Sequence, residues 1–212
     1  MHPLAAHAQA VLAAFAARGD VLDLIEMPTA RVHRTEANNA EMGTVAAIGL
    51  CAGTAVMLTG TGNDLGVLDR RAIQTRDCQP YHDAQGMPIA AAERHIAAAF
   101  ERAVGHATDE LRELIEDLEA DVRVAGINFK EYKMSSSLGV RLRSHAMCHG
   151  AEGEMTRDAL WAACEALGLA VHAAPFDVID PRTEGIGKVI GPPWRKEHKL
   201  AASAALAALL AH

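Results

Sequence analysis

The feature that most constrains the fold is an almost continuously apolar stretch at residues 45–60, interrupted by one small turn. Its sequence is Val-Ala-Ala-Ile-Gly-Leu-Cys-Ala-Gly-Thr-Ala-Val-Met-Leu-Thr-Gly. A strand with no polar residue at alternate positions is buried on both faces, and a tight turn that contains glycine places a hairpin partner beside it. We therefore predict two central strands, at residues 45–51 and 54–59.

The remainder of the chain alternates between helical and strand patterns. Apolar spacing, proline and glycine positions predict a third strand at residues 65–75, a loop at 76–86, and helices at 88–104 and 108–120. A second continuously apolar strand is predicted at 122–129. It is followed by a helix at 156–167, a strand at 169–173, a loop at 175–193 and a closing helix at 194–210. This order predicts an α/β fold with helices on both faces of a mixed sheet.

The chain has 212 residues, which is the length of one domain of ordinary size. We expect residues 1–44 to form an N-terminal extension with a helix at residues 4–18, and residues 45–212 to form the domain itself. No function can be assigned to the extension from its sequence.

Composition excludes some classes of function and compartment. The formal net charge is -7, so any binding of nucleic acid requires a local basic face. No apolar run is long enough for a membrane span. The four cysteines have no CxxC spacing, which indicates reduced thiols and a cytoplasmic protein, not a disulfide framework.

Residues 48–54, Ile-Gly-Leu-Cys-Ala-Gly-Thr, carry a family resemblance. The pattern apolar-Gly-apolar-X-small-Gly-Thr resembles the first strand of RNase H-like domains, in particular those of RuvC-type Holliday-junction resolvases. The order of elements from residue 45 onward is similar as well, and so are Pro175 and the segment Gly-Ile-Gly-Lys at 185–188. The resemblance implies a three-strand meander plus two parallel strands, with positions 51 and 128 close together at one end of the sheet.

The sequence departs from that family where its metal ligands stand. Such nucleases use carboxylates at the ends of the first and fourth strands and on the closing helix, because two Mg²⁺ or Mn²⁺ ions need charged oxygen ligands. Here Cys51 and Asn128 occupy the two strand positions, and the closing helix is rich in alanine. The nearest candidates on that helix are Glu197 and His198. The nuclease site is therefore predicted to be degraded.

Basic residues are concentrated in two segments that the resemblance places beside the site, where cations would meet DNA phosphates. The candidates are Lys130, Lys133, Arg141, Arg143, Lys188, Arg195, Lys196 and Lys199. Family resolvases act as dimers, which implies a homodimer. A separate metal candidate is the set His145, His149 and Glu152, whose i, i+4, i+7 spacing puts three ligands on one helical face.

Three functions are open at this point. The leading hypothesis is recognition of branched or structured DNA by an RNase H-like protein whose metal site is degraded. The second is an active endonuclease that uses displaced ligands, such as Glu131, Glu152 or His198. The third is a non-enzymatic scaffold that binds a protein partner.

Overall fold

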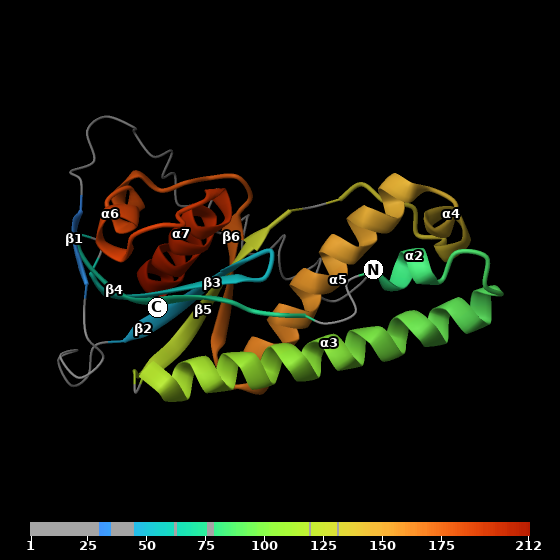
Figure 1. The fold of residues 1–212 in the computed structure, drawn as a ribbon, viewed down its shortest axis with the longest axis horizontal. Coiled ribbons are helices and arrows are strands. Elements are labelled where there is room, and N and C mark those ends of the chain that lie inside the picture. Colours follow the sequence, from blue (N-terminus) through green and yellow to red (C-terminus); the bar gives the residue numbers. More distant parts are fainter. Residues whose placement is uncertain (1–29, 35–44, 62, 76–78, 119, 131) are drawn as a thin grey trace.

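A six-stranded mixed sheet is the centre of the part of the chain that the computed structural model describes, residues 30–34, 45–61, 63–75, 79–118, 120–130 and 132–212 (Figure 1). The strand order is β1-β4-β3-β2-β5-β6. The strands are β1 (Arg31–Arg34), β2 (Ala46–Cys51), β3 (Thr54–Thr61), β4 (Asp64–Ala72), β5 (Val122–Phe129) and β6 (Ala170–Pro175). The helix predicted at residues 4–18 lies outside the described residues.

The strand pairing confirms the predicted sheet. Strands β2, β3 and β4 form an antiparallel meander, while β5 pairs parallel to β2 and β6 parallel to β5. The two most apolar strands, β2 and β5, are therefore adjacent at the centre, where both of their faces are covered. This is the three-strand meander plus two parallel strands that the RNase H-like resemblance implies, with β1 added at one edge.

The turn between β2 and β3 consists of Ala52 and Gly53, which both have positive φ angles, 46° and 77°. A two-residue hairpin turn of this kind follows the right-handed twist of its strands. At Gly53 a Cβ atom would lie 2.9 Å from the carbonyl oxygen of Ile73, so a side chain is excluded on two grounds. The turn fixes where β2 ends, at Cys51.

Strand β1 was not predicted. It pairs parallel to β4 at the edge of the sheet, and its Val32 packs against the core between the sheet and helices α6 (Ile186–Ile190) and α7 (Lys196–Ala211). It belongs to residues 1–44, the segment that we expected to form an N-terminal extension.

Helices cover both faces, as predicted. The helices are α2 (Pro80–Asp83), α3 (Ile89–Leu118), α4 (Leu138–Leu142), α5 (His145–Ala166), α6 (Ile186–Ile190) and α7 (Lys196–Ala211), with a 3₁₀ turn η2 at Pro181–Thr183. One core packs Ile48 and Leu50 against α3 and α5, and the other packs Ala47 and Val56 against α6 and α7. In Figure 1, α3 and α5 continue beyond the sheet and meet α2 and α4 there.

Three predicted boundaries were wrong. The two helices predicted at 88–104 and 108–120 are one helix, α3, because Ala99, Ala103, Ala107, Leu111 and Leu114 form one continuous buried stripe across the expected break. The loop predicted at 175–193 contains η2 and α6, and the loop at 76–86 contains α2.

Helix α5 also begins earlier than predicted, at His145 instead of residue 156, and runs through Gly150 and Gly153. Those glycines are accommodated because the Tyr132 side chain packs on them. An added Cβ at Gly150 would lie 3.4 Å from a ring carbon of Tyr132, and one at Gly153 would lie 3.1 Å from its hydroxyl oxygen. Among the residues described, no helix has the length and apolar character needed to cross a membrane.

Candidate functional site

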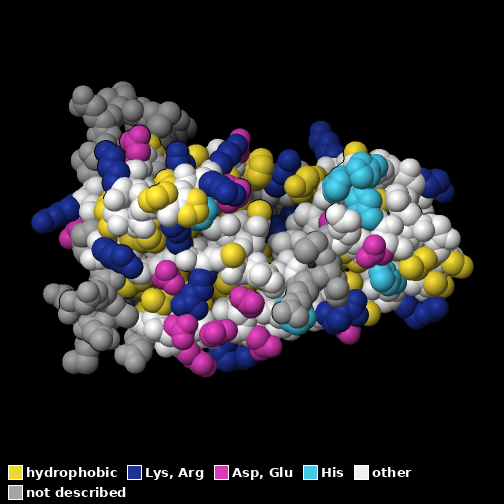
Figure 2. Space-filling model, in the orientation of Figure 1, with side chains coloured by type: hydrophobic (Ala, Val, Ile, Leu, Met, Phe, Trp, Pro, Cys, Tyr) yellow, Lys and Arg dark blue, Asp and Glu magenta, His cyan; other side chains and the backbone are white. Residues whose placement is uncertain are grey.

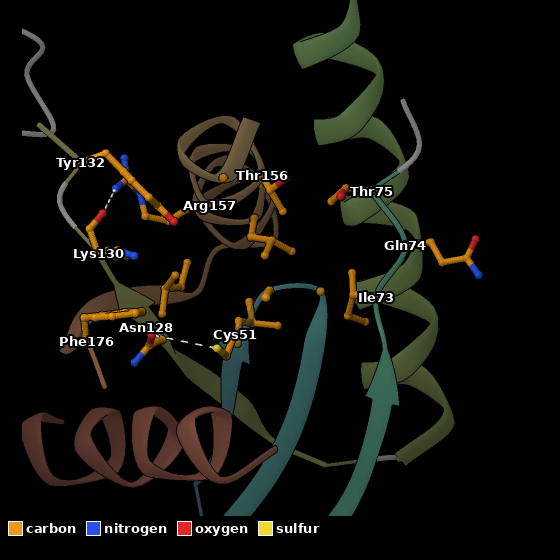
Figure 3. Close-up of a pocket in the computed structure, with 16 residues that line it drawn as sticks. Cys51, Ile73, Gln74, Thr75, Asn128, Lys130, Tyr132, Thr156, Arg157 and Phe176 are labelled. Carbon is orange, nitrogen blue, oxygen red and sulfur yellow. Dashed lines mark hydrogen bonds between the residues drawn. The ribbon is translucent and has the colours of Figure 1, made fainter. Parts of the chain in front are cut away.

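Cys51 and Asn128 lie side by side at the carboxyl ends of β2 and β5. The Cys51 Sγ atom is 3.9 Å from Asn128 Oδ1 (Figure 3). Asn128 Nδ2 donates to the carbonyl oxygen of Pro175 at 3.0 Å. Because β2, β5 and β6 are parallel, their carboxyl ends come to the same edge. The predicted proximity of positions 51 and 128 is confirmed.

A cavity of about 620 Å³ opens at this edge. Its walls are the β2–β3 turn, the segment after β4, the end of β5 and the middle of α5 (Figure 3). The polar and aromatic residues that line it are Cys51, Gln74, Thr75, Asn128, Lys130, Tyr132, Thr156, Arg157 and Phe176. Its size is within the range of pockets for small organic ligands.

A lysine between two aromatic rings lies on the rim of the cavity. Lys130 Nζ is 4.8 Å from the centre of the Tyr132 ring and 4.9 Å from that of Phe176. Arg157 donates to the carbonyl oxygen of Lys130 at 3.1 Å and pairs with Asp158 at 2.7 Å. Sequence reasoning found Lys130 but missed Arg157 and Phe176, because nothing local marks a helix residue and a loop residue as neighbours.

The two cavity residues at the ends of β2 and β5 are uncharged. Burial raises the pKa of the Cys51 thiol to about 11, and the nearby Glu197 carboxylate adds to this shift against the opposing effect of Lys196. The thiol is therefore protonated at neutral pH, and the Asn128 amide carries no charge. Glu197 is the acid on α7 whose charge reaches this thiol.

This donor set does not fit a pair of magnesium ions. Among the described residues, the one place where three metal-ligating side chains converge is His82, His145 and His149, away from this cavity. A thiol and an amide are poor ligands for Mg²⁺, which prefers charged oxygen.

Helix α7 packs very closely on the sheet at two glycines of the central strands. Gly49 and Gly126 are register partners on β2 and β5. A Cβ atom at Gly49 would lie 1.7 Å from the backbone oxygen of Ala201, and one at Gly126 would lie 1.9 Å from that of Ala204. Only small side chains fit at these two crossing points, where α7 carries Ala201 and Ala204.

His198 does not reach the cavity wall. Its Nδ1 accepts from the backbone N–H of Arg195 at 3.1 Å, and its ring packs on Trp194 with centroids 5.5 Å apart. These contacts make it a helix-capping residue at the start of α7. Glu131 lies outside the described residues, and Glu152 contacts His82.

The predicted basic residues do not form one face. Lys130 lines the cavity, and Lys133 lies three residues after it in the chain. Lys196, at the start of α7, pairs with Asp177 and is close in sequence to Arg195 and Lys199. Arg141 and Arg143 belong to the α4 region, whereas Lys188 is on α6. Figure 1 places α4 and α6 at opposite ends of the long axis, and Figure 2 shows Lys and Arg side chains dispersed over the visible face.

The three metal candidates, His145, His149 and Glu152, do come together. The structure adds His82 from α2, which sequence reasoning missed. His82 is more than sixty residues away in the chain, so no spacing rule could connect it to them.

Two solved structures overlap with this fold. The chain is similar to the structure of Thermus thermophilus RuvC (11% identity, TM-score 0.42, covering 77% of this chain and 91% of that one). It is also similar to T. thermophilus RuvC in complex with a Holliday junction substrate (12% identity, TM-score 0.41, covering 78% and 90%). No protein-family model and no curated protein matches the sequence. The strand order agrees with the RNase H-like arrangement expected from the sequence, and that agreement does not rest on this overlap.

Proposed function

We propose that this protein recognises branched or otherwise structured DNA at the cavity beside Cys51 and Asn128, without hydrolysing it through a two-metal centre. The observation that carries the proposal is Lys130, held between the rings of Tyr132 and Phe176 beside the uncharged Cys51 and Asn128 side chains. A cation and aromatic rings together match the chemistry of an unpaired nucleotide.

Each part of the rim has a counterpart in a nucleotide. Aromatic side chains stack on bases that are not held in a duplex, and a lysine attracts the adjoining phosphate. Phe176 is 44% exposed, so a base can reach its ring from solvent. Branch points in DNA present such unpaired or unstacked nucleotides, whereas a regular duplex does not.

The charge distribution limits the kind of binding. With a net charge of -7, the protein's average field repels DNA, so affinity must come from contacts at the cavity rim. Each phosphate neutralised steepens the fall of log affinity with log salt by about 0.9 for duplex arms and about 0.7 for single strands. We therefore expect selectivity for branched DNA and a shallow salt dependence.

The test is a binding titration of labelled four-way junction, duplex and single strand at several salt concentrations. Lys130→Ala and Phe176→Ala should each weaken junction binding at least fivefold, and only Lys130→Ala should reduce the salt slope. Lys188→Ala on the distant α6 is the matched control and should bind as the parent does. Equal binding by Lys130→Ala and the parent, or no binding at low salt, would favour a partner-binding scaffold instead.

Cleavage is measured in parallel. With Mg²⁺ or Mn²⁺ present, the parent should leave the junction intact, because the described residues that line its cavity include no carboxylate. Divalent-dependent cutting that is lost on replacing Glu197 would contradict the proposal and favour a nuclease with displaced ligands. The size of the free and DNA-bound protein by light scattering tests the expected homodimer.

A further inference from the structure

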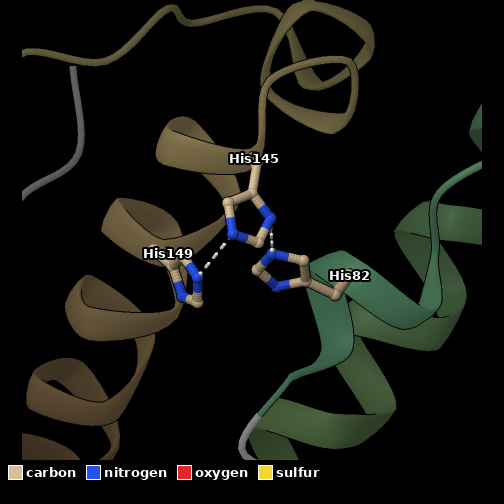
Figure 4. A group of neighbouring side chains, drawn as sticks. All are labelled: His82, His145 and His149. Carbon is tan, nitrogen blue, oxygen red and sulfur yellow. Dashed lines mark hydrogen bonds between the residues drawn. The ribbon is translucent and has the colours of Figure 1, made fainter.

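The part of the molecule beyond the sheet holds a cluster of three histidines. Helix α2 is a single short helix that packs against α5 and α3 over a small apolar core, which includes Ala84, Ala92 and Leu142. This packing brings His82 of α2 against His145 and His149 of α5, which are one helical turn apart (Figure 4).

The three imidazole rings face one another through their nitrogen atoms. His82 Nε2 is 2.9 Å from His145 Nδ1, and His149 Nε2 is 3.1 Å from His145 Nε2. One ligand atom from each ring lies within 4.8 Å of the others. Two nitrogens on one tetrahedral zinc ion are about 3.4 Å apart, given a Zn–N distance of about 2.0–2.1 Å. Small rotations of the exposed His145 and His149 side chains would meet that geometry.

Glu152 orients the cluster from behind. Its carboxylate accepts from His82 Nδ1 at 2.8 Å and from the backbone N–H of His82 at 3.1 Å, and its side chain is only 8% exposed. It also lies 3.7 Å from His149 Nδ1. A carboxylate bonded to one ring nitrogen fixes the tautomer and leaves the other nitrogen free for a metal, the arrangement found behind metal-bound histidines.

Packing alone gives no reason for this arrangement. His149 is 55% exposed and His145 is exposed too, so these rings gain little from burial. In the metal-free protein the three rings can form a chain of N–H···N hydrogen bonds, in which His82 Nε2 accepts because its Nδ1–H is donated to Glu152. A metal ion would replace these bonds by taking one nitrogen lone pair from each ring.

We propose that His82, His145 and His149 form a binding site for a borderline divalent transition-metal ion, Zn²⁺, with Glu152 as the residue that positions His82. Imidazole favours Zn²⁺ over Mg²⁺, and three histidines leave one tetrahedral position for water. The solvent-facing side of the cluster provides that fourth position. The site is separate from the cavity at Cys51 and does not depend on the function proposed for it.

The experiment titrates Zn²⁺ into chelator-treated full-length protein against a chromophoric chelator. The parent should bind one Zn²⁺ per chain, and His145→Ala and His149→Ala should each lower the affinity at least 100-fold. Glu152→Gln should lower it 10- to 100-fold, the usual effect of removing an orienting partner. His106→Ala, on α3 outside the cluster, is the matched control and should bind as the parent does.

Substitution with Co²⁺ gives an independent readout, because a tetrahedral site with nitrogen ligands produces strong visible bands. These bands should be present in the parent and absent from the His145→Ala/His149→Ala double variant. Both replaced side chains are exposed, so the metal-free variants should melt at the parent's temperature even if Glu152→Gln fails to fold. Parent affinity no tighter than that of the double variant, or an equal loss in His106→Ala, would overturn the site.

Discussion

Replacing Gly126 by alanine tests the close approach of α7 to the centre of the sheet. The added Cβ would lie 1.9 Å from the backbone oxygen of Ala204 and 2.4 Å from its carbonyl carbon. An ordinary carbon–oxygen contact is about 3.3 Å, so the gap is short by about 1.4 Å. The obstructing atoms belong to a helix backbone and cannot rotate away, so α7 must shift as a unit.

The expected loss of unfolding free energy is about 3 kcal/mol, the upper end of the usual range for overpacked cores. Moving α7 also loosens its contacts with Val56 and Leu58, which are fully buried beneath it. For a chain of this length, the loss corresponds to a melting temperature lower by about 6–12 °C. Urea unfolding followed by far-UV circular dichroism measures the free energy directly.

Gly105→Ala is the matched control. Gly105 lies within α3, and a Cβ there would meet nothing within 4 Å. Alanine in an open helix interior should stabilise the protein by about 0.5–1 kcal/mol, since it restricts the unfolded chain and favours the helix. If the unfolding free energy of Gly126→Ala is within about 0.5 kcal/mol of the parent's, α7 does not pack directly on the glycines and the reasoning fails.

Three further predictions concern the cavity and its surroundings. With its pKa raised to about 11, the Cys51 thiol is about one thousandth ionised at pH 8, against about one tenth for an ordinary thiol. Cys51 should therefore react with a disulfide reagent on the order of 100-fold more slowly in the folded protein than in urea, and the reaction should accelerate toward pH 11. The Cys51→Ser variant identifies which part of the labelling belongs to Cys51. Arg70 donates to the carbonyl groups of residues 191–193, so Arg70→Lys, which lacks the planar fork, should lose about 1–2 kcal/mol in urea unfolding; an unchanged midpoint would argue against this anchor. The double variant Cys51→Asp/Asn128→Glu, with Glu197 nearby, should bind one Mn²⁺ more than the parent by calorimetry, and an equal Mn²⁺ stoichiometry would show that the pocket cannot hold a metal.

The sequence predicted the sheet because the signal is carried within single segments. Continuous apolar runs identify strands that are buried on both faces, and the turn at residues 52–53 identifies the hairpin. The parallel pairing that brings Cys51 to Asn128 followed from the family resemblance and not from local pattern. It is confirmed by the register of β2 with β5.

The missed features depend on contacts between distant segments. The gap predicted between residues 104 and 108 is absent because a buried stripe, mostly of alanines, carries α3 through it, and α5 starts well before residue 156 because Tyr132 packs against Gly150 and Gly153. His82 has no local signature, since its partners lie on another helix. Binding of DNA at the cavity is inferred from the side chains at its rim and stays a prediction.

Strand β1 has a consequence for the chain's behaviour in solution. It covers the outer hydrogen-bonding edge of β4, whose Leu65, Val67 and Leu68 are buried, and it presents exposed arginines at positions 31 and 34. An uncovered strand edge of this apolar kind is a template for pairing with other molecules, and charged edge strands oppose it. A fragment trimmed to residues 45–212 would retain the family-like elements yet expose that edge. We therefore expect β1 to oppose self-association through the sheet edge. The fragment should aggregate at protein concentrations at which the full chain does not.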